Sequence, residues 1–230
     1  KRDKIMQIED YYSQLKNEVS NYFLLQSKKP FLVEILKGNL SDERYTYWVR
    51  VDYVYLINFS KILALGISKG KTIEEMKVMN DYLNWILNEE MSLHVDHAKK
   101  NGISENELFN CEMGPIKYSY TRHENNCANA GDLGILISGI LARIVGWQVV
   151  SKILLGGETV SDNNKYKGWL TMYSEDKILQ DHTSKILKIF NSYAGNGNEE
   201  YRDTLKKNFL LGVKYETMCW DAYYNMEVWI

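Results

Sequence analysis

The chain has 230 residues, of which 45% are apolar, so it is long enough to bury a large core. Its formal net charge of −2 argues against a nucleic-acid partner and against an anionic membrane surface. No window approaches the roughly 18 apolar residues of a membrane span, and the charged opening KRDKIMQIED lacks the apolar region of a secretory signal.

The apolar residues recur with a period of about 3.6 residues, which is typical of helices. Only two prolines interrupt the chain, and this scarcity favours long helices. The first predicted helix carries one apolar stripe, formed by Ile8, Tyr12, Leu15, Val19 and Phe23. The second begins at Pro30 and ends at Gly38, because proline favours the first helical turn and glycine follows the last.

The third predicted helix begins after the capping residue Ser41 and runs to Gly66. Residues 71–102 indicate another long helix, closed by Asn101 and Gly102. A short helical cap at 104–108 precedes a helix in residues 114–130. The apolar segment 131–157 is expected to be the central helix. Two further helical segments, 163–194 and 199–229, complete a predicted single all-α domain over residues 1–230.

Three of these apolar helices carry a charged residue on an apolar face: Asp52, Arg143 and Glu216. Helical spacing places aromatic or sulfur groups beside each charge. Tyr55 and Phe59 lie on the face of Asp52, and Trp147 lies on that of Arg143. Cys219 and Trp220 lie on the face of Glu216. Such charges either lie in solvent beside a core stripe or are buried, and buried charges tend to be paired or functional. Both interpretations stay open at this point.

The segment NEEMSLHVDHAKK resembles a metal site, because Glu90, His94 and His97 share one helix face. Imidazole and carboxylate groups suit iron, zinc or manganese. A di-metal helical site needs such groups from several helices, whereas His123 and His182 are isolated. We interpret this face as a polar exterior and expect neither a metal nor a cofactor.

The cysteines give an expectation about the compartment. Cys111, Cys127 and Cys219 cannot all pair with one another, and none belongs to a C-x-x-C motif. This usage favours a reducing cytoplasm. The chain also contains no glycine-rich phosphate loop and no G-x-S-x-G motif.

Several segments together resemble the TenA/thiaminase II family, in the order and with the spacing of that family. They are FLVEILKGNLSDERYTYWVRVDYVYLINFSKILALG, EEMSLHVDHA, IKYSYTRH, YKGWLTMYSED and NFLLGVKYETMCWDAYY. The resemblance implies one TenA-like helical domain of the haem-oxygenase fold that forms a homo-oligomer, a dimer or a tetramer. It also implies hydrolysis of thiamin or of its degraded aminopyrimidine, with release of hydroxymethylpyrimidine for salvage.

The resemblance also implies a pyrimidine pocket. In it Asp52 holds the amino edge of the ring, although Val51 replaces the glutamine that precedes it in the family. The surrounding tyrosines are Tyr55, Tyr120 and Tyr173, and the proton-transferring carboxyl is Glu216. An ionised carboxylate accepts two hydrogen bonds from such an edge, while tyrosine rings supply flat walls.

One departure concerns the family's nucleophilic cysteine. Counted from Tyr120 without a gap, that position is Arg143, and the downstream tyrosine becomes Trp147; a one-residue shift gives Ala142 instead. Arginine cannot be a nucleophile because it stays protonated. We expect Arg143 to enter the pocket and pair with Glu216, with Asp52 or with an anionic ligand, and such pairing lowers the pKa of a carboxyl.

Three functions follow from this departure. The first is hydrolysis by another route, in which Glu216 activates water or Cys219 is a relocated nucleophile whose thiolate Arg143 favours. The second is a non-catalytic protein that binds a small molecule, with Arg143 holding a carboxylate or phosphate. The third, a haem or di-metal oxygenase on the same fold, is disfavoured because no histidine precedes His94.

Overall fold

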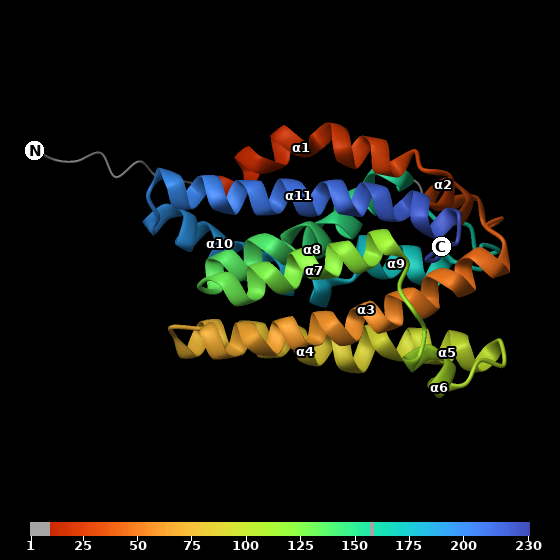
Figure 1. The fold of residues 1–230 in the computed structure, drawn as a ribbon. Helices are drawn as coiled ribbons and strands as arrows, with labels where there is room; N and C mark the ends of the chain where they lie inside the picture. The colour runs from red at the N-terminus through yellow and green to blue at the C-terminus, as the bar shows by residue number, and fades with distance from the viewer. Residues whose placement is uncertain (1–9, 157–158) are drawn as a thin grey trace, which may run out of the picture.

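Residues 10–156 and 159–230 are described by a computed structural model, and they form helices without a strand (Figure 1). The predicted all-α class is confirmed for these residues. In chain order the elements are α1 (Tyr11–Ser27), α2 (Pro30–Lys37), α3 (Asp42–Lys69), α4 (Ile73–Trp85), η1 (Ile86–Glu90), α5 (Met91–Lys100), α6 (Glu105–Phe109), α7 (Pro115–Ala130), α8 (Leu133–Leu155), α9 (Lys167–Glu175), α10 (Lys177–Asn196) and α11 (Glu199–Tyr224).

Local sequence signals set several of these boundaries. Pro30 occupies the first turn of α2, and Gly38 ends it in the left-handed conformation, with φ of 74°. The Ser41 side chain accepts a hydrogen bond from the Arg44 backbone N–H and so caps α3. The apolar stripe of α1 is buried as predicted from Tyr12 onward. The predicted place of Ile8 and the interpretation of the charged opening segment lie outside the described residues.

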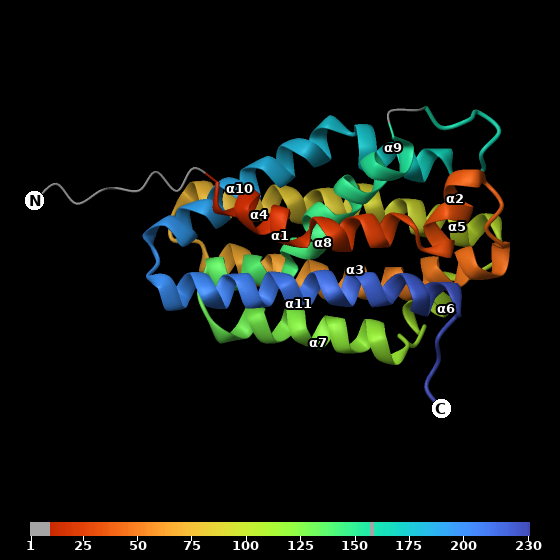
Figure 2. The ribbon, with the colours of Figure 1, turned by 90° about the horizontal axis from the view of Figure 1, so that it is seen from above.

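The long helices run side by side, with α3 and α4 along one edge of the bundle and α1 and α11 along the opposite edge (Figure 1). The predicted central helix is α8, which Figure 2 shows between α10 on one side and α7 and α11 on the other. It also packs against α1, α2, α3 and α9. Nearly every residue of α8 is buried because apolar side chains surround its axis.

The prediction that no segment is apolar enough to span a membrane is wrong by length and composition. Both α3 and α8 are long enough and apolar enough to cross a membrane. In α8, however, 89% of the most apolar stretch is buried inside the bundle, against 44% in α3. Burial of this extent identifies α8 as the interior helix of the bundle.

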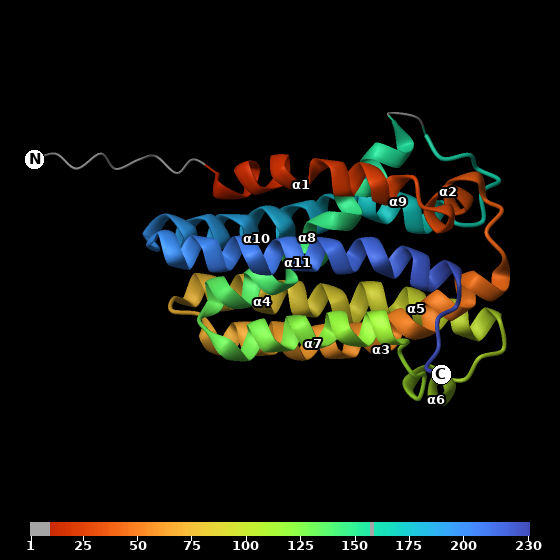
Figure 3. The ribbon, with the colours of Figure 1, turned by 45° about the horizontal axis from the view of Figure 1, so that its top comes forward.

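The chain end fixes the start of α7. Figure 3 shows α6 and the C-terminus at the same end of the bundle. There the carboxylate of Glu227 accepts a hydrogen bond of 2.9 Å from the Ile116 backbone N–H, and the Trp229 indole donates one of 2.9 Å to the Met113 carbonyl. A carboxylate at a helix N-terminus is favourable for the helix dipole. These contacts attach the N-terminal end of α7, the helix that carries Tyr120, to the C-terminal segment.

The predicted helix over residues 71–102 contains an unexpected π turn. It comprises α4, η1 and α5 in succession. In a regular α-helix, residues four apart drift by about 40° around the axis at each step. The wider turn of η1 reduces this drift and keeps on one buried face a series of residues: Tyr82, Ile86, Glu90, His94 and Ala98. Single π turns are frequent at functional sites.

Candidate active site

The helices bring the predicted site residues into the interior of the bundle. Asp52 is 3% exposed, Arg143 3% and Glu216 5%. They are therefore not solvated charges beside a core stripe. The other predicted residues are buried as well: Tyr55, Tyr120, Trp147, Tyr173 and Cys219. These residues come from α3, α7, α8, α9 and α11.

Arg143 forms a buried ion pair, but its partner is Glu90. The guanidinium Nη2 donates to the Glu90 carboxylate, and the Tyr173 hydroxyl donates to the same oxygen. The predicted pairing of Arg143 with Glu216 or Asp52 is thus wrong. The predicted polar exterior at Glu90 and His94 is also wrong, since they are 0% and 4% exposed. Glu90 and His94 share one helix face as predicted, but that face packs into the core.

Asp52 is held as an ionised carboxylate by His94 and Lys117. His94 Nε2 lies 3.1 Å from Asp52 Oδ2, and Lys117 Nζ lies 3.8 Å from Oδ1. Burial by itself raises the pKa of Asp52, but the His94 hydrogen bond and the Lys117 charge outweigh it, so the pKa is lowered. The pKa of His94 is raised, because the hydrogen bond and charge of Asp52 exceed the effect of burial.

Glu216 has the opposite electrostatic character. Burial raises the pKa of its carboxyl, and the charges of Lys117 and Arg143, together with the nearby Tyr120 hydroxyl, only partly oppose this effect. The expected lowering of its pKa by a direct pair with Arg143 does not occur. Its Oε1 is buried without a hydrogen-bond partner. Glu216 is thus able to hold or accept a proton.

Cys219 is one turn from Glu216 and completely buried. Burial raises the pKa of its thiol, and Lys117 is the cation that opposes this effect. Arg143, which we expected to favour the thiolate, is engaged by Glu90 instead. The thiol is therefore stabilised in its neutral form, which is a poor nucleophile.

Aromatic rings form the walls around these charges. The rings of Trp147 and Tyr173 stack with centroids 4.9 Å apart, and Trp220 meets Trp147 edge-on at 4.4 Å. On the other side, Tyr55 and Tyr120 are stacked at 6.2 Å. Such walls lower the local dielectric and suit a flat ligand.

Two charged residues of α7 join the cluster without having been predicted. The Lys117 ammonium lies 3.3 Å from the centroid of the Tyr55 ring, and Glu124 accepts a hydrogen bond of 2.8 Å from the Tyr55 hydroxyl. Both are buried, at 3% and 0% exposure. The sequence contains the spacing that could have identified them. Lys117 precedes Tyr120 by three residues and Glu124 follows it by four, so all three lie on one face of a helix.

Several buried polar atoms of this cluster have no hydrogen-bond partner: Glu90 Oε2, Tyr120 Oη, Glu124 Oε2, Arg143 Nε and Glu216 Oε1. Leaving such an atom unsatisfied costs about 1–3 kcal/mol. A concentration of them is unusual for a core that serves stability alone. These atoms mark the cluster as the candidate functional site among the described residues.

The proposed absence of a metal stays a prediction. Both ring nitrogens of His94 are occupied, Nε2 by Asp52 and Nδ1 by the Glu90 carbonyl oxygen at 2.9 Å. In the described parts of the chain, no group of three His, Cys, Asp or Glu residues could hold a metal ion. We expect elemental analysis after dialysis to find no stoichiometric metal. About one iron or zinc per chain would contradict this expectation.

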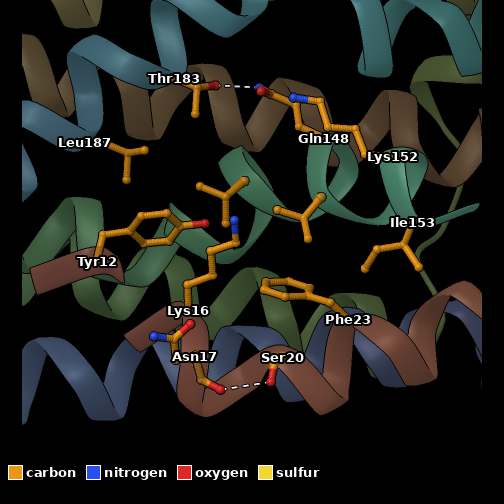
Figure 4. A pocket seen from close by; sticks show the side chains of 12 residues that line it. Tyr12, Lys16, Asn17, Ser20, Phe23, Gln148, Lys152, Ile153, Thr183 and Leu187 are labelled. Carbon is orange, nitrogen blue, oxygen red and sulfur yellow. Dashed lines mark hydrogen bonds between the residues drawn. The ribbon is translucent and has the colours of Figure 1, made fainter. Parts of the chain in front are cut away.

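A separate cleft of about 430 Å³ opens between α1, α8 and α10 (Figure 4). Its lining includes Lys16, Lys152 and the hydrogen-bonded pair Gln148 and Thr183. It contains none of the predicted site residues. The cleft is therefore distinct from the buried cluster, which remains the candidate active site.

Comparison with known proteins identifies relatives of the whole chain. An aminopyrimidine aminohydrolase from Halalkalibacterium halodurans is 29% identical over 200 residues, which cover 87% of this chain and 89% of that protein. A TenA homologue from P. horikoshii superposes with a TM-score of 0.82 at 19% identity, covering 93% of this chain and 98% of that one.

The fold extends to a domain of unknown function from Shewanella denitrificans, which has a heme oxygenase-like fold. Its TM-score is 0.68 at 12% identity, over 93% of this chain and 91% of that one. The predicted haem-oxygenase-like fold is thereby confirmed. The model of the TENA/THI-4/PQQC family matches residues 24–226. Because this match covers most of the 230 residues, the chain belongs to the TENA/THI-4/PQQC family.

Proposed function

We propose that the protein hydrolyses the C–N bond of an aminopyrimidine and releases hydroxymethylpyrimidine for thiamin salvage. The observation that carries this proposal is the buried cluster around Asp52, in which Tyr120 and Glu216 hold unpartnered oxygens between aromatic walls. Family membership and a relative named aminopyrimidine aminohydrolase support the same substrate class.

Substrate binding is assigned to Asp52 and the surrounding rings. The lowered pKa of Asp52 keeps its carboxylate ionised, and an ionised carboxylate accepts hydrogen bonds from an amino group and a protonated ring nitrogen. We assign the buried rings of Tyr55, Tyr120 and Tyr173 to the walls around the flat heterocycle. This assignment rests on the resemblance together with the burial of these side chains.

The proposed chemistry uses water as the nucleophile, activated by Glu216. A carboxylate with a raised pKa is a stronger base than an ordinary one, so Glu216 in its ionised form is suited to accept a proton from water. Cys219 is not given the nucleophile's role, because burial keeps its thiol neutral. Of the two routes open from the sequence, the direct activation of water by Glu216 is thus favoured.

Arg143 is assigned a positioning role in this proposal. Its guanidinium charge is already compensated by the Glu90 carboxylate, which weakens its attraction for a ligand carboxylate or phosphate. The pair fixes Tyr173, whose hydroxyl shares the Glu90 oxygen. For this reason we do not extend the proposal to a non-catalytic protein that binds an anionic ligand.

The wider setting is also part of the proposal. We assign the reaction to one TenA-like domain over residues 1–230, in a homo-oligomer in the reducing cytoplasm, without a cofactor or a nucleic-acid partner. The three cysteines are free, which suits a reducing compartment.

The experiment that tests the function is a product assay. The unsubstituted protein is incubated with the aminopyrimidine and, separately, with thiamin, and hydroxymethylpyrimidine is quantified by chromatography. We expect release from the aminopyrimidine. A Glu216→Gln preparation, purified in parallel, controls for a contaminating hydrolase. Failure to release hydroxymethylpyrimidine from either compound would contradict the proposed function.

A further inference from the structure

Glu124 is a completely buried carboxyl that the proposed reaction has not yet used. One of its oxygens, Oε1, accepts a hydrogen bond of 2.8 Å from the Tyr55 hydroxyl. The other, Oε2, is buried without a partner. A carboxyl that served only to satisfy Tyr55 would not need a second buried oxygen, because a hydroxyl or amide accepts the same hydrogen bond.

The position of Glu124 places it beside the other reactive groups. It lies on α7 one turn after Tyr120, whose hydroxyl is also unpartnered. The neighbouring helix α11 carries Glu216, whose charge acts on Glu124. Two carboxyls, each with an unpartnered buried oxygen, therefore lie near one tyrosine hydroxyl, whose pKa is raised by burial and by the charges of both Glu216 and Glu124. This arrangement provides the two proton-transfer groups that a hydrolysis without a covalent nucleophile requires.

We propose that Glu124 is a second catalytic carboxyl, which donates a proton to the leaving amine while Glu216 accepts one from the attacking water. This inference rests on the proposed function, which assigns a base but no general acid, and it assigns that acid to Glu124. The water oxygen bonds to the methylene carbon of the substrate, and the water proton passes to the Glu216 carboxylate. The electron pair of the breaking C–N bond remains on nitrogen, which takes the proton of Glu124.

The products of this step are hydroxymethylpyrimidine and ammonia. It leaves Glu216 protonated and Glu124 ionised, so the return of one proton from Glu216 to Glu124 restores the starting state. No oxidant, reductant or cofactor takes part.

The charges that face Glu124 explain why it holds a proton at neutral pH. Burial is the main cause that raises its pKa to about 8, and the charge of Glu216 on α11 adds to it. Lys117 on α7, the Tyr55 hydroxyl on α3 and Arg143 on α8 act in the opposite direction. Their combined effect does not cancel the burial. Near pH 7 the protonated form is therefore the main one, as an acid requires.

Glu124→Gln is the variant that tests this role. The glutamine retains the volume and the acceptor for the Tyr55 hydroxyl but cannot donate a carboxyl proton. We expect kcat to fall by roughly 10²-fold or more, with a smaller change in KM. We also expect the decline of kcat above about pH 8, which reports ionisation of Glu124, to disappear from the residual activity. The exposed Glu74→Gln on α4 is a charge-matched control and should leave kcat unchanged.

A second measurement does not depend on turnover. Because the pKa of Glu124 is higher in the folded protein than in the unfolded chain, the folded state binds more protons between about pH 4.5 and 8. The stability that this proton binding contributes is present at low pH and is lost as the pH rises towards 8. We expect the denaturation midpoint to decrease less over this range in Glu124→Gln than in the unsubstituted protein.

The outcomes separate the two proposals. No turnover by the unsubstituted protein contradicts the proposed function and, with it, the role of Glu124. Turnover by the unsubstituted protein that survives unchanged in Glu124→Gln overturns the role of Glu124 alone. An identical pH dependence of stability in both proteins also overturns it, because Glu124 then does not hold the proton that the step needs.

Discussion

Glu216→Gln is expected to lower the rate of hydroxymethylpyrimidine release by roughly 10²- to 10⁴-fold, which is the usual contribution of one general base. Its buried Oε1 has no partner in the protein, so the carboxylate is available to take a proton from water. The amide has nearly the same shape but cannot accept that proton. Steady-state kinetics at several pH values measures the effect.

Two controls accompany this variant. Glu200→Gln makes the same chemical change at an exposed position on α11 and should leave the rate unaltered. The affinity for hydroxymethylpyrimidine, measured by calorimetry, should change far less than kcat, because Asp52 and the aromatic walls are retained. A Glu216→Gln protein that keeps most of the original rate would show that Glu216 is not the base.

The second large effect concerns stability. Arg143→Met leaves the completely buried Glu90 carboxylate without its cationic partner. Removal of one partner of such a pair costs about 3–5 kcal/mol of the free energy of unfolding, because the remaining charge is buried and uncompensated. Chemical denaturation of the unsubstituted and substituted proteins measures this difference.

A double-mutant cycle identifies the cause of that loss. Glu90→Gln in the Arg143→Met background removes the uncompensated charge, and its amide oxygen still accepts from Tyr173, so most of the lost stability should return. Lys185→Met removes one partner of the exposed pair with Asp181 on α10 and is expected to have no measurable effect. Equal losses in the single and double variants would contradict the importance of the Arg143–Glu90 pair.

Much of the fold was predictable because its signals are local. Pro30 and Gly38 bound α2 through their own backbone preferences, and the apolar character of residues 131–157 requires an interior helix. These inferences need only the sequence within one helix. For Asp52, Arg143 and Glu216 the sequence left a solvated and a buried position open, and the structure shows them buried.

The partners of the buried charges were not predictable in the same way. Glu90 reaches Arg143 from a helix face whose charged residues and histidines indicated an exterior position, although it packs into the core. Lys117 and Glu124 enter the site through contacts with Tyr55 on another helix. Such pairings depend on how α3, α7 and α8 pack against one another, and the pattern within a single helix does not contain that information.

The central claim is that this site hydrolyses an aminopyrimidine without a cysteine nucleophile. The most direct test is the rate of hydroxymethylpyrimidine release by Cys219→Ala, compared with that of the unsubstituted protein. Cys219 is the buried thiol beside Glu216, and its raised pKa disfavours the thiolate. We predict turnover close to that of the unsubstituted protein. Loss of turnover in a variant that keeps its helical content and stability would contradict the claim, because it would show that the thiol attacks the substrate.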